Sequence, residues 1–452
     1  MAERDRLIGD VVRRSGNRRL VWVGLRGDDI EPLADIPQLH GAYSVLGTYR
    51  RRSRVQSLSY EELAGVRVDP EVWDIDDHLR DRHIVTFRRE LLRTLAGRAA
   101  ILPYRPSEFL SSIYFARYEE CLYLGQFSAQ QSAFEHKPWV ETAVADLGLP
   151  RIGWTYVANE DQARAREISR MGSVVLRRSR TSGGNGFIHV DTPEDLMVAW
   201  EDVDEAFMSV GPYIDGALPV NVGGVVWRDG VTVHHPSVQL VGVESCTRRE
   251  FGYCGNDFGL IRELDVEVID QIDANTKAIG AWLGRHGYLG AFGVDFLVRH
   301  GVPLFTEVNP RFQGSTSASC QISIDLGRGC ILLEHIAAWL GLRCPATEPL
   351  REVVAVTPDL SNLVVHWTGL AAARVDVDLL VNGVRRADQS ARADVLTPCD
   401  VHNETGSTVA RFALRRRITQ SGFDLSEDLD NSIEGWQDAM RTAHDGTEEA
   451  WH

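Results

Sequence analysis

Residues 293–315, which read GVDFLVRHGVPLFTEVNPRFQGS, constrain the fold of this chain more than any other segment. Every second residue from 292 to 298 is apolar, which predicts a strand that carries Asp295 on its other face. The Gly and Pro that follow are typical of a turn into a second strand. Glu307 and Asn309 lie two residues apart on that second strand and therefore share a face. A hairpin would bring both of them close to Asp295.

The residue types on this hairpin indicate a metal site. Carboxylate and amide oxygens suit Mg²⁺, and Mg²⁺ commonly bridges phosphate oxygens. Arg311 follows two residues after Asn309 and would add a positive charge beside them. Each of the four residues alone fits the solvated polar face of an ordinary hairpin. Their order and spacing together favour the metal site.

The whole-chain composition narrows the class of protein. At 452 residues the chain is long enough for two or three domains. A net charge of −16 argues against nucleic acid as the main partner. The sequence contains no run of about 18 apolar residues, so we expect no membrane-spanning helix. The seven cysteines form no CxxC pair, and the first residues lack the apolar stretch of a secretory signal. We therefore expect a reduced, cytoplasmic protein.

The chain contains two lysines among 48 basic residues, Lys137 and Lys277. Lysine is a compact point charge that arginine does not replace at a crowded phosphate. A lysine in a chain so rich in arginine is therefore a candidate phosphate contact. Lys137 precedes Pro138 at the start of a predicted helix. A second helix, a strand, a glycine-rich loop, a return strand and a third helix follow, which predicts a compact α+β lobe.

The glycine-rich loop, TSGGNG at residues 181–186, lets backbone N–H groups approach phosphate oxygens closely. Such a loop alone is equally typical of a β-turn. It is not a Walker loop, because no GK[ST] follows. Its position adds weight, since it lies about forty residues after Lys137 and about 110 before the metal hairpin.

In this order of features, residues 131–342 resemble the ATP-grasp enzymes, in which an acidic residue after an apolar strand is followed by E-x-N-x-R. The resemblance implies ATP and Mg²⁺ as cofactors, with Mg²⁺ held by Asp295, Glu307 and Asn309. Arg311 would neutralise charge on the transferring phosphoryl group. The remaining implied ATP contacts are Lys137, Arg177, Ser182, Gly183, Gly184, Asn185 and Gly186.

Two positions depart from the family pattern. The second basic position is usually lysine and is Arg177 here, which serves phosphate as a bidentate donor but leaves the adenine contacts of a lysine stem open. Gly211 and Pro212 occupy places where the family usually carries acidic residues. The residue that would hold the ribose hydroxyls therefore stays open.

The resemblance predicts the fold and its division into domains. We expect an ATP-grasp fold of two α+β lobes, residues 131–210 and 211–345. An α/β domain at residues 1–130 would precede it. A small β-rich domain with an acidic tail would follow at residues 346–452.

ATP-grasp enzymes mostly join a carboxylate to an amine through an acylphosphate, with release of ADP. The chain resembles the natural-product peptide ligases of the pheganomycin type, which implies amino acid and peptide substrates. From the residues we expect Arg248 or Arg249, in a long polar loop, to bind a substrate carboxylate, and Gln239 to line the same site. A homodimer is the usual state of an enzyme of this size.

Two alternatives stay open. The first is a different ATP-grasp activity, a kinase or a carboxylase. The second is a nucleotide-binding regulatory protein that does not turn over. The substrates and the direction of peptide growth also stay open.

Overall fold

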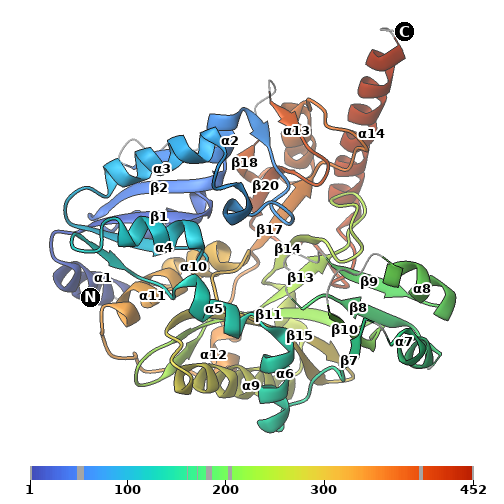
Figure 1. The fold of residues 1–452 in the computed structure, drawn as a ribbon, viewed down its shortest axis with the longest axis horizontal. Coiled ribbons are helices and arrows are strands. Elements are labelled where there is room, and N and C mark those ends of the chain that lie inside the picture. The colour runs from blue at the N-terminus through green and yellow to red at the C-terminus, as the bar shows by residue number, and fades with distance from the viewer. Residues whose placement is uncertain are drawn as a thin grey trace.

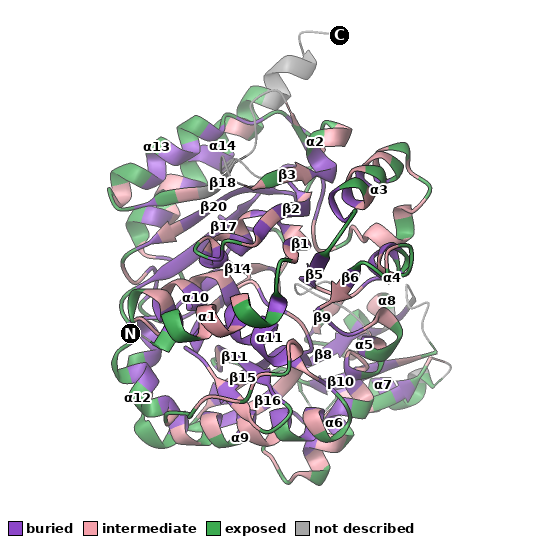
Figure 2. Cartoon of the chain, turned by 90° about the vertical axis from the view of Figure 1, so that its left-hand side faces the viewer, coloured by how far each residue is buried: buried purple, intermediate pink, exposed green. Residues whose placement is uncertain are grey.

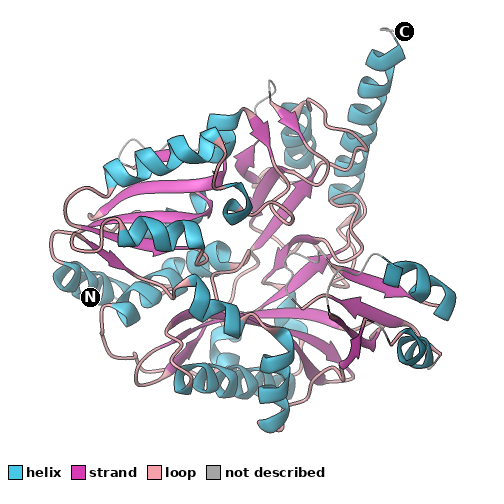
Figure 3. Cartoon of the chain, viewed as in Figure 1, coloured by secondary structure: helices cyan, strands magenta, loops and turns pink. Residues whose placement is uncertain are grey.

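The computed structural model describes residues 3–47, 55–159, 161–170, 172–179, 186–201, 206–396 and 401–449. In these described residues, three larger β-sheets with helices on their faces and one two-stranded sheet make up the molecule, as Figure 3 shows. Buried strands run through the interior and exposed helices form much of the surface (Figure 2). In the part of the chain that is described, no helix combines the length and the apolar character that crossing a membrane would need.

The first sheet is parallel and belongs to the N-terminal region. Its strand order is β3-β2-β1-β5-β6. The strands are β1 (Arg19–Arg26), β2 (Leu39–Leu46), β3 (Gln56–Ser59), β5 (Ala99–Pro103) and β6 (Cys121–Tyr123), and the helices are α1 (Glu3–Ser15), α2 (Tyr60–Ala64), α3 (Arg82–Thr94) and α4 (Glu108–Phe115). The chain runs outward in one direction from β1 to β3 and resumes on the other side at β5. Open parallel sheets bind ligands at such a switch point, outside the carboxyl ends of the strands.

The second sheet is small and antiparallel, in the order β7-β10-β8-β9. It comprises β7 (Thr155–Ala158), β8 (Val174–Arg177), β9 (Phe187–Val190) and β10 (Phe207–Pro212), with α7 (Gln162–Ser169) and α8 (Pro193–Glu201) packed beside it. Its apolar core includes Leu176, Trp200 and Met208. This lobe projects at the lower right of Figure 1. The predicted helices and the two strands around the glycine-rich loop are present in the predicted order, but the sequence prediction missed β7, which lies between the first two helices.

The third sheet is the largest, with the order β16-β15-β11-β13-β14-β17-β20-β18 and β12 paired to β11. Its first half comprises β11 (Leu218–Val226), β12 (Val231–Val233), β13 (Ser237–Val241), β14 (Tyr253–Asp257), β15 (Gly290–Arg299) and β16 (Val302–Asn309). Helix α9 (Val266–Arg285) packs on one face, against Val220 and Val222. Helix α11 (Ile331–Trp339) packs on the other face, against Val225.

The core under α11 is shared with the N-terminal sheet. Trp22 of β1 packs against Phe312, and both belong to the same apolar cluster as Ile331 and Leu333 of α11. Shorter elements complete this region: β4 (Val66–Arg67), α5 (Ser128–Phe134), α6 (Lys137–Asp146), α10 (Thr316–Asp325) and the 3₁₀ helices Asp28–Leu33, Ile75–His78 and Leu260–Glu263. The N-terminal sheet is therefore fixed against the large sheet rather than attached by a free linker.

The C-terminal region does not form a sheet of its own. β17 pairs with β14 of the large sheet, and β20 and β18 extend it further. The elements are α12 (Leu350–Ala355), β17 (Ser361–His366), α13 (Val377–Ala387), β18 (Arg392–Leu396), β19 (His402–Asn403), β20 (Thr408–Leu414) and α14 (Glu427–Glu449). β19 also pairs with β4, which ties this region to the N-terminal one.

The expectation of a β-rich C-terminal region was wrong for residues 377–387, which form α13. The run VDLLVNGVRRA lies in the segment that was expected to be β-rich, and its three valines favour a strand. Its buried positions Val377, Leu380, Val381 and Val384 nevertheless follow the helical spacing. Asp376 also caps the helix, since its side chain accepts a hydrogen bond from Leu379 N.

Candidate active site

One cavity of about 670 Å³ lies where the three sheets meet. Its walls come from the carboxyl ends of β1 and β2, from the small sheet and the hinge after β10, and from the hairpin β15–β16. His366 and Phe423 of the C-terminal region also line it. Each predicted site residue can be placed relative to this cavity.

The hairpin is built as the sequence predicts. β15 and β16 pair antiparallel, and His300 and Gly301 form the turn with φ of 50° and 76°. Both angles lie in the left-handed region, which a two-residue type I′ turn requires. Asp295 lies directly opposite Glu307 in the register, and a bulge follows Asp295. The turn therefore fixes which side chains face each other.

Asp295, Glu307 and Asn309 come together at the cavity wall. Asn309 Nδ2 donates to Asp295 Oδ2 at 2.8 Å and lies 3.4 Å from Glu307 Oε1. Asn221 of β11 and Gln313 donate to Asp295 Oδ1 from the other side. A Cβ on residue 293 would lie 1.8 Å from the Gln313 side chain, so glycine is required there for Gln313 to reach Asp295.

The electrostatics of the two carboxylates differ. Desolvation, together with the neighbouring charge of Glu307, raises the pKa of Asp295 to about 7. Desolvation also acts on Glu307, but the charges of Lys137, Arg177 and Arg311 together outweigh it and lower the pKa of Glu307. Two shielded carboxylates beside an asparagine amide, whose oxygen would face a cation once the amide turns over, form a donor set that a divalent cation fits. The residues present therefore suit the predicted Mg²⁺.

Lys137 lies at the start of α6 and forms an ion pair with Glu307. Its side chain is 8% exposed, and Pro138 at the first turn agrees with the predicted helix start. The ammonium approaches the carboxylate cluster and, among the described residues, does not belong to the cavity lining. Direct contact between Lys137 and a phosphate stays a prediction.

Arg177 ends β8 and lines the cavity, fully buried. Its guanidinium stacks 3.9 Å from the Trp154 ring and pairs with Glu141, which also accepts a hydrogen bond from Tyr156. This network holds a cation beside the hinge that joins the small sheet to the large one. Arg177 Nε is buried and has no hydrogen-bond partner in the part of the chain that the structure describes.

The glycine-rich loop falls largely outside the described residues. Ser182, Gly183, Gly184 and Asn185 belong to that part, and their predicted phosphate contacts stay predictions. Gly186 is described at the start of the return strand, with a φ of 75°, and its carbonyl accepts a hydrogen bond from Arg178 N. The strands on both sides of the loop are in the predicted places.

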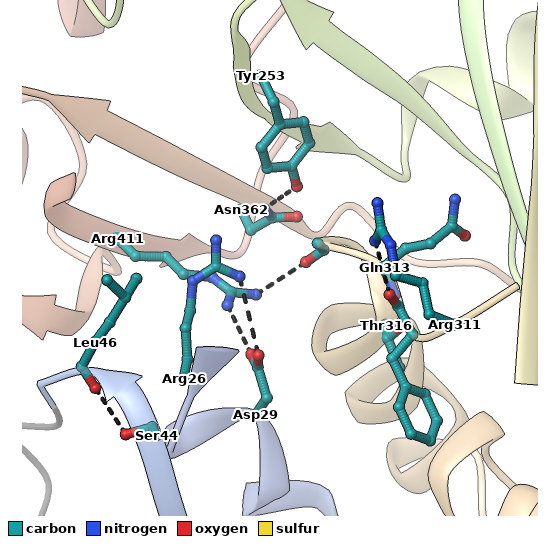
Figure 4. A network of polar contacts seen from close by, with 12 residues as sticks. Arg26, Asp29, Ser44, Leu46, Tyr253, Arg311, Gln313, Thr316, Asn362 and Arg411 are labelled. Atoms are coloured by element: carbon teal, nitrogen blue, oxygen red, sulfur yellow. Dashed lines mark hydrogen bonds and ion pairs between the residues drawn. The ribbon is translucent and has the colours of Figure 1, made fainter. Parts of the chain in front are cut away.

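Arg311 lines the cavity just after the hairpin. A tight turn, in which Arg311 N donates to Asn309 O at 2.8 Å, sets its position, and its guanidinium donates to Phe312 O. Figure 4 shows Arg311 beside Gln313 and Thr316. The predicted arginine is thus at the same end of the cavity as the carboxylate cluster.

Arg248 and Arg249 lie in the loop between β13 and β14, and neither side chain is among the described residues that line the cavity. Arg248 is exposed and donates to Thr368 O at 3.5 Å. Arg249 pairs with Asp69 and with Glu71, whose carboxylate does line the cavity. Desolvation outweighs Arg249 and raises the pKa of Glu71 to about 7. In this structure Arg249 therefore acts on the cavity through Glu71.

The sequence analysis missed the residues that the N-terminal sheet contributes. Arg26 ends β1, Arg105 follows β5, and Glu71 and Trp73 come from the segment after β4. The switch-point rule applied to the predicted parallel strands would have pointed to Arg26 and Arg105. Gln239, which was expected at the site, lines the cavity and donates to Asp295 Oδ1 at 3.4 Å.

Comparison with known proteins identifies the fold. A family model described as an ATP-grasp domain matches residues 161–315. An Aspergillus clavatus carboxyaminoimidazole ribonucleotide synthase, solved with ATP, aligns with a TM-score of 0.58 at 14% identity and covers 94% of this chain and 99% of that one. The chain has the ATP-grasp fold.

A second ATP-grasp structure is also similar. The biotin carboxylase of Campylobacter jejuni, in a β,γ-ATP complex, aligns with a TM-score of 0.58 at 15% identity and covers 88% of both chains. The matched structures include complexes with ATP, with ADP and with MgADP, which agrees with the predicted cofactors. These alignments cover the N-terminal and C-terminal regions as well as the ATP-grasp core.

The alignments with curated relatives cover a smaller part of the chain. A formate-dependent phosphoribosylglycinamide formyltransferase of Nitratidesulfovibrio vulgaris is 31% identical over 218 residues, which is 45% of this chain and 49% of the relative. The enzyme of the same name from Erythrobacter litoralis is 24% identical over 242 residues, 52% of this chain and 59% of the relative. The chain spans about half the length of the curated relatives it matches.

Proposed function

We propose that this chain is an ATP- and Mg²⁺-dependent ligase that activates a carboxylate as an acylphosphate and couples it to an amine. One observation carries the proposal. The Asp295–Glu307–Asn309 cluster and Arg311 lie in the same cavity as the switch point of the N-terminal sheet. A nucleotide phosphate and a second substrate would therefore meet in a single enclosed space.

The nucleotide would occupy the part of the cavity between the two ATP-grasp lobes. Trp154, Val175 and Leu297 offer apolar surface there, and the hinge at residues 213–217 offers backbone polar groups. An apolar slot with a few polar edges suits an adenine ring. Arg177 at the end of this slot would face the phosphates.

In the first step a substrate carboxylate oxygen attacks the γ-phosphorus, the bond to the β-phosphate oxygen breaks, and ADP leaves. Mg²⁺ on Asp295, Glu307 and Asn309 would supply charge neutralisation between the phosphates. Arg311 offers a second positive charge on the same side. Lys137 keeps Glu307 ionised, since it lowers the pKa of that carboxyl.

In the second step an amine attacks the acyl carbon and inorganic phosphate leaves. The attacking amine must lose a proton. Glu71 is a cavity carboxylate with a pKa raised to about 7, which suits a proton acceptor near neutral pH. Arg249 is a positioning residue in this scheme because it holds Glu71.

The part of the cavity that the N-terminal region lines, here called the second compartment, suggests the substrate class. Trp73, Phe87, Tyr104 and Phe109 line it together with the charged side chains of Arg26 and Arg105. This mixture suits an amino acid or peptide with an apolar side chain, as the pheganomycin-type resemblance implied. The relatives named above are not peptide ligases, so this part of the proposal depends on the compartment alone. A homodimer stays a prediction.

The relatives support a second candidate. Their names describe formyl transfer to phosphoribosylglycinamide at the expense of formate. Formate is a carboxylate and glycinamide carries an amine, so the same activation chemistry applies. A kinase, a carboxylase and a non-catalytic nucleotide-binding protein would each give a different product pattern.

The deciding experiment measures ADP release from MgATP with hydroxylamine as a surrogate amine. Formate, single amino acids and short peptides are supplied as separate carboxylate pools, and hydroxamate formation is recorded. A second set replaces hydroxylamine with phosphoribosylglycinamide or with amino acids, and mass spectrometry identifies the product. We expect ADP and a hydroxamate from an amino acid or peptide pool.

Glu307→Gln should reduce turnover by about 10²–10³, the loss seen when one preorganised electrostatic group such as an oxyanion-hole donor is removed from an enzyme. Glu267→Gln on the exposed start of α9 is the matched control and should keep full activity. Hydroxamate from formate alone would favour the formyltransferase reading. AMP as the product, or ADP without any hydroxamate, would contradict acylphosphate ligation.

A further inference from the structure

Arg26 places a guanidinium on the cavity wall, and no described residue forms a hydrogen bond with that group. It is the last residue of β1, at the switch point of the parallel sheet, and its residue surface is 6% exposed. Its Nε is buried and has no hydrogen-bond partner among the described residues. The nearest ion-pair contact in that part of the chain runs from Nη1 to Asp29 Oδ2 at 3.9 Å, which is too long for a hydrogen bond.

The carboxylate of Asp29 is already engaged by a different arginine. Arg411 of β20 donates from Nη1 to Asp29 Oδ1 at 2.9 Å and from Nη2 to Gly314 O at 3.2 Å. Figure 4 shows both guanidinium groups above this one carboxylate. Two buried cations thus share one anion.

The consequence concerns hydrogen bonding. Asp29 accepts its hydrogen bond from Arg411, so among the described residues the Arg26 guanidinium has only the 3.9 Å ion pair and no hydrogen-bonded counter-charge. A buried charge without a paired counter-charge is costly, so such groups are retained where a ligand supplies the opposite charge. The position at a switch point of an open parallel sheet is where a ligand is expected.

The surroundings of Arg26 define the shape of the site. Tyr253 of β14 lines the same cavity, and its hydroxyl is close enough that the charges of Arg411 and Arg26 oppose the rise that desolvation causes in its pKa. Gly314 and Ser315, which follow the hairpin β15–β16 and Arg311 in the chain, form the adjoining wall of the cavity. An anion beside Arg26 would therefore lie between the N-terminal sheet and the turn that follows Arg311.

We propose that Arg26 is a specificity-determining residue that binds an oxyanion of the second substrate, with Arg411 and Asp29 as positioning residues. The inference deepens the proposed function, because it assumes that the cavity is the substrate site of a ligase. The oxyanion is a carboxylate in an amino acid or peptide and a phosphate in a sugar phosphate. Both groups accept the paired N–H bonds that a guanidinium offers.

The test compares Arg26→Gln, Arg26→Lys and Arg411→Gln with the exposed α13 variant Arg385→Gln in the full-length chain. The probes are hippurate, its neutral amide hippuramide, and phenyl phosphate, which share a phenyl ring and differ in the charged group. Binding is measured by titration calorimetry at matched ionic strength. Unfolding of each unliganded variant is measured in parallel.

We expect Arg26→Gln to weaken hippurate binding about tenfold to hundredfold, the loss expected for a charged hydrogen-bonded contact. Hippuramide binding should be the same in wild type and variant, and Arg26→Lys should recover part of the affinity. A loss confined to phenyl phosphate would assign the site to a phosphorylated substrate instead. Arg385→Gln should leave all three affinities unchanged.

Stability separates a binding role from a structural one. Arg26→Gln removes a costly charge and should leave the unfolding temperature equal or higher. Arg411→Gln leaves the buried Asp29 without its short hydrogen-bonded ion pair and should lower it. The inference is overturned if Arg26→Gln binds both anions as wild type does, if wild type binds neither anion, or if Arg26→Gln lowers the unfolding temperature as Arg411→Gln does.

MgATP binding, measured on the same proteins, keeps the two proposals apart. It should be equal in wild type and Arg26→Gln. Arg26-dependent anion binding without any MgATP binding would leave the anion site standing and remove the ligase. If ADP is released from MgATP but anion binding does not depend on Arg26, the ligase proposal stands and the Arg26 anion site is removed.

Discussion

Asp295 couples the chemistry of the site to the protonation of the protein. Its carboxylate faces Glu307 across the hairpin, and desolvation together with that charge raises its pKa to about 7. Near neutral pH a substantial fraction of the metal-free protein therefore carries a proton on Asp295 that a bound cation would displace. Mg²⁺ affinity should fall as the pH is lowered through about 7.

The same shift predicts a pH dependence of stability. A carboxyl group with a raised pKa binds its proton more tightly in the folded state, so its contribution to stability is greatest at low pH and is lost as the pH rises toward about 7. One pH unit in this range corresponds to about 1.4 kcal/mol. Asp295→Asn should therefore show a shallower fall in Tm between pH 5 and about 7 than wild type.

Thermal unfolding of the metal-free protein at several pH values measures this slope. The exposed variant Asp325→Asn should keep the wild-type slope. Added Mg²⁺ should raise the Tm of wild type near pH 8 and not that of Asp295→Asn. Equal slopes for wild type and Asp295→Asn would show that Asp295 is ionised throughout.

At the same scale, sequence predicted some site residues and missed others for a physical reason. The metal candidates were found because strand alternation and a short turn are local properties. Arg26 and Glu71 were missed because their places at the cavity depend on contacts between distant segments. Arg249 was expected to bind substrate, whereas its pairing with Asp69 and Glu71 arises only when the N-terminal region packs against the β13–β14 loop.

At the scale of elements, α13 shows how a local pattern misleads. Its β-branched residues favoured a strand, in which alternate residues share a face. In the helix, the neighbours Leu380 and Val381 are both buried in one apolar cluster with α14. The helical period and the Asp376 cap outweigh the intrinsic preference. The hairpin β15–β16 was predicted correctly because its pattern and its turn agree.

Substitutions in α13 test this assignment. Leu380→Ala should destabilise the protein by about 2–5 kcal/mol, as expected when a buried leucine is truncated. Val381→Ala should also destabilise it, because a helix buries both neighbours whereas an amphipathic strand would bury one. Asp378→Ala on the exposed face should change stability by less than about 0.5 kcal/mol. Denaturant unfolding gives all three values, and a silent Val381→Ala would contradict the packing described.

At the scale of the whole molecule, the C-terminal region belongs to the body of the fold. β17 covers the edge of β14, and β20 supplies Arg411 to the buried pair with Asp29. Sequence placed the domain boundary near residue 346 from composition, but the strand pairing that crosses it is long-range. In Figure 1 the orange C-terminal strands lie next to the blue N-terminal sheet.

Truncation measures how far the stability of the whole chain depends on its C-terminal region. A chain ending at Ala443 keeps Leu429, Ile433 and Trp436 of α14 in the core and should keep the wild-type Tm within a few degrees. A chain ending at Ser426 loses those three side chains and should unfold at a much lower temperature or aggregate. A chain ending at residue 345 exposes the edge of β14 and should be insoluble. A stable, monomeric product of the last truncation would contradict the continuous sheet.

The pairing of β4 with β19, like the contact between Asp29 and Arg411 of β20, joins segments from the two ends of the chain, and this has a consequence for biosynthesis. At about 5–20 residues per second, a ribosome releases β1 on the order of tens of seconds before β20. Arg26 therefore emerges long before Arg411, and the wall that both arginines shape is completed only near the end of translation. In a nascent chain that stalls before β20, most residues of the nucleotide slot are present, but the wall that Arg26 and Arg411 shape is incomplete. Chaperone protection of this protein should accordingly be needed for most of its synthesis rather than at one brief step.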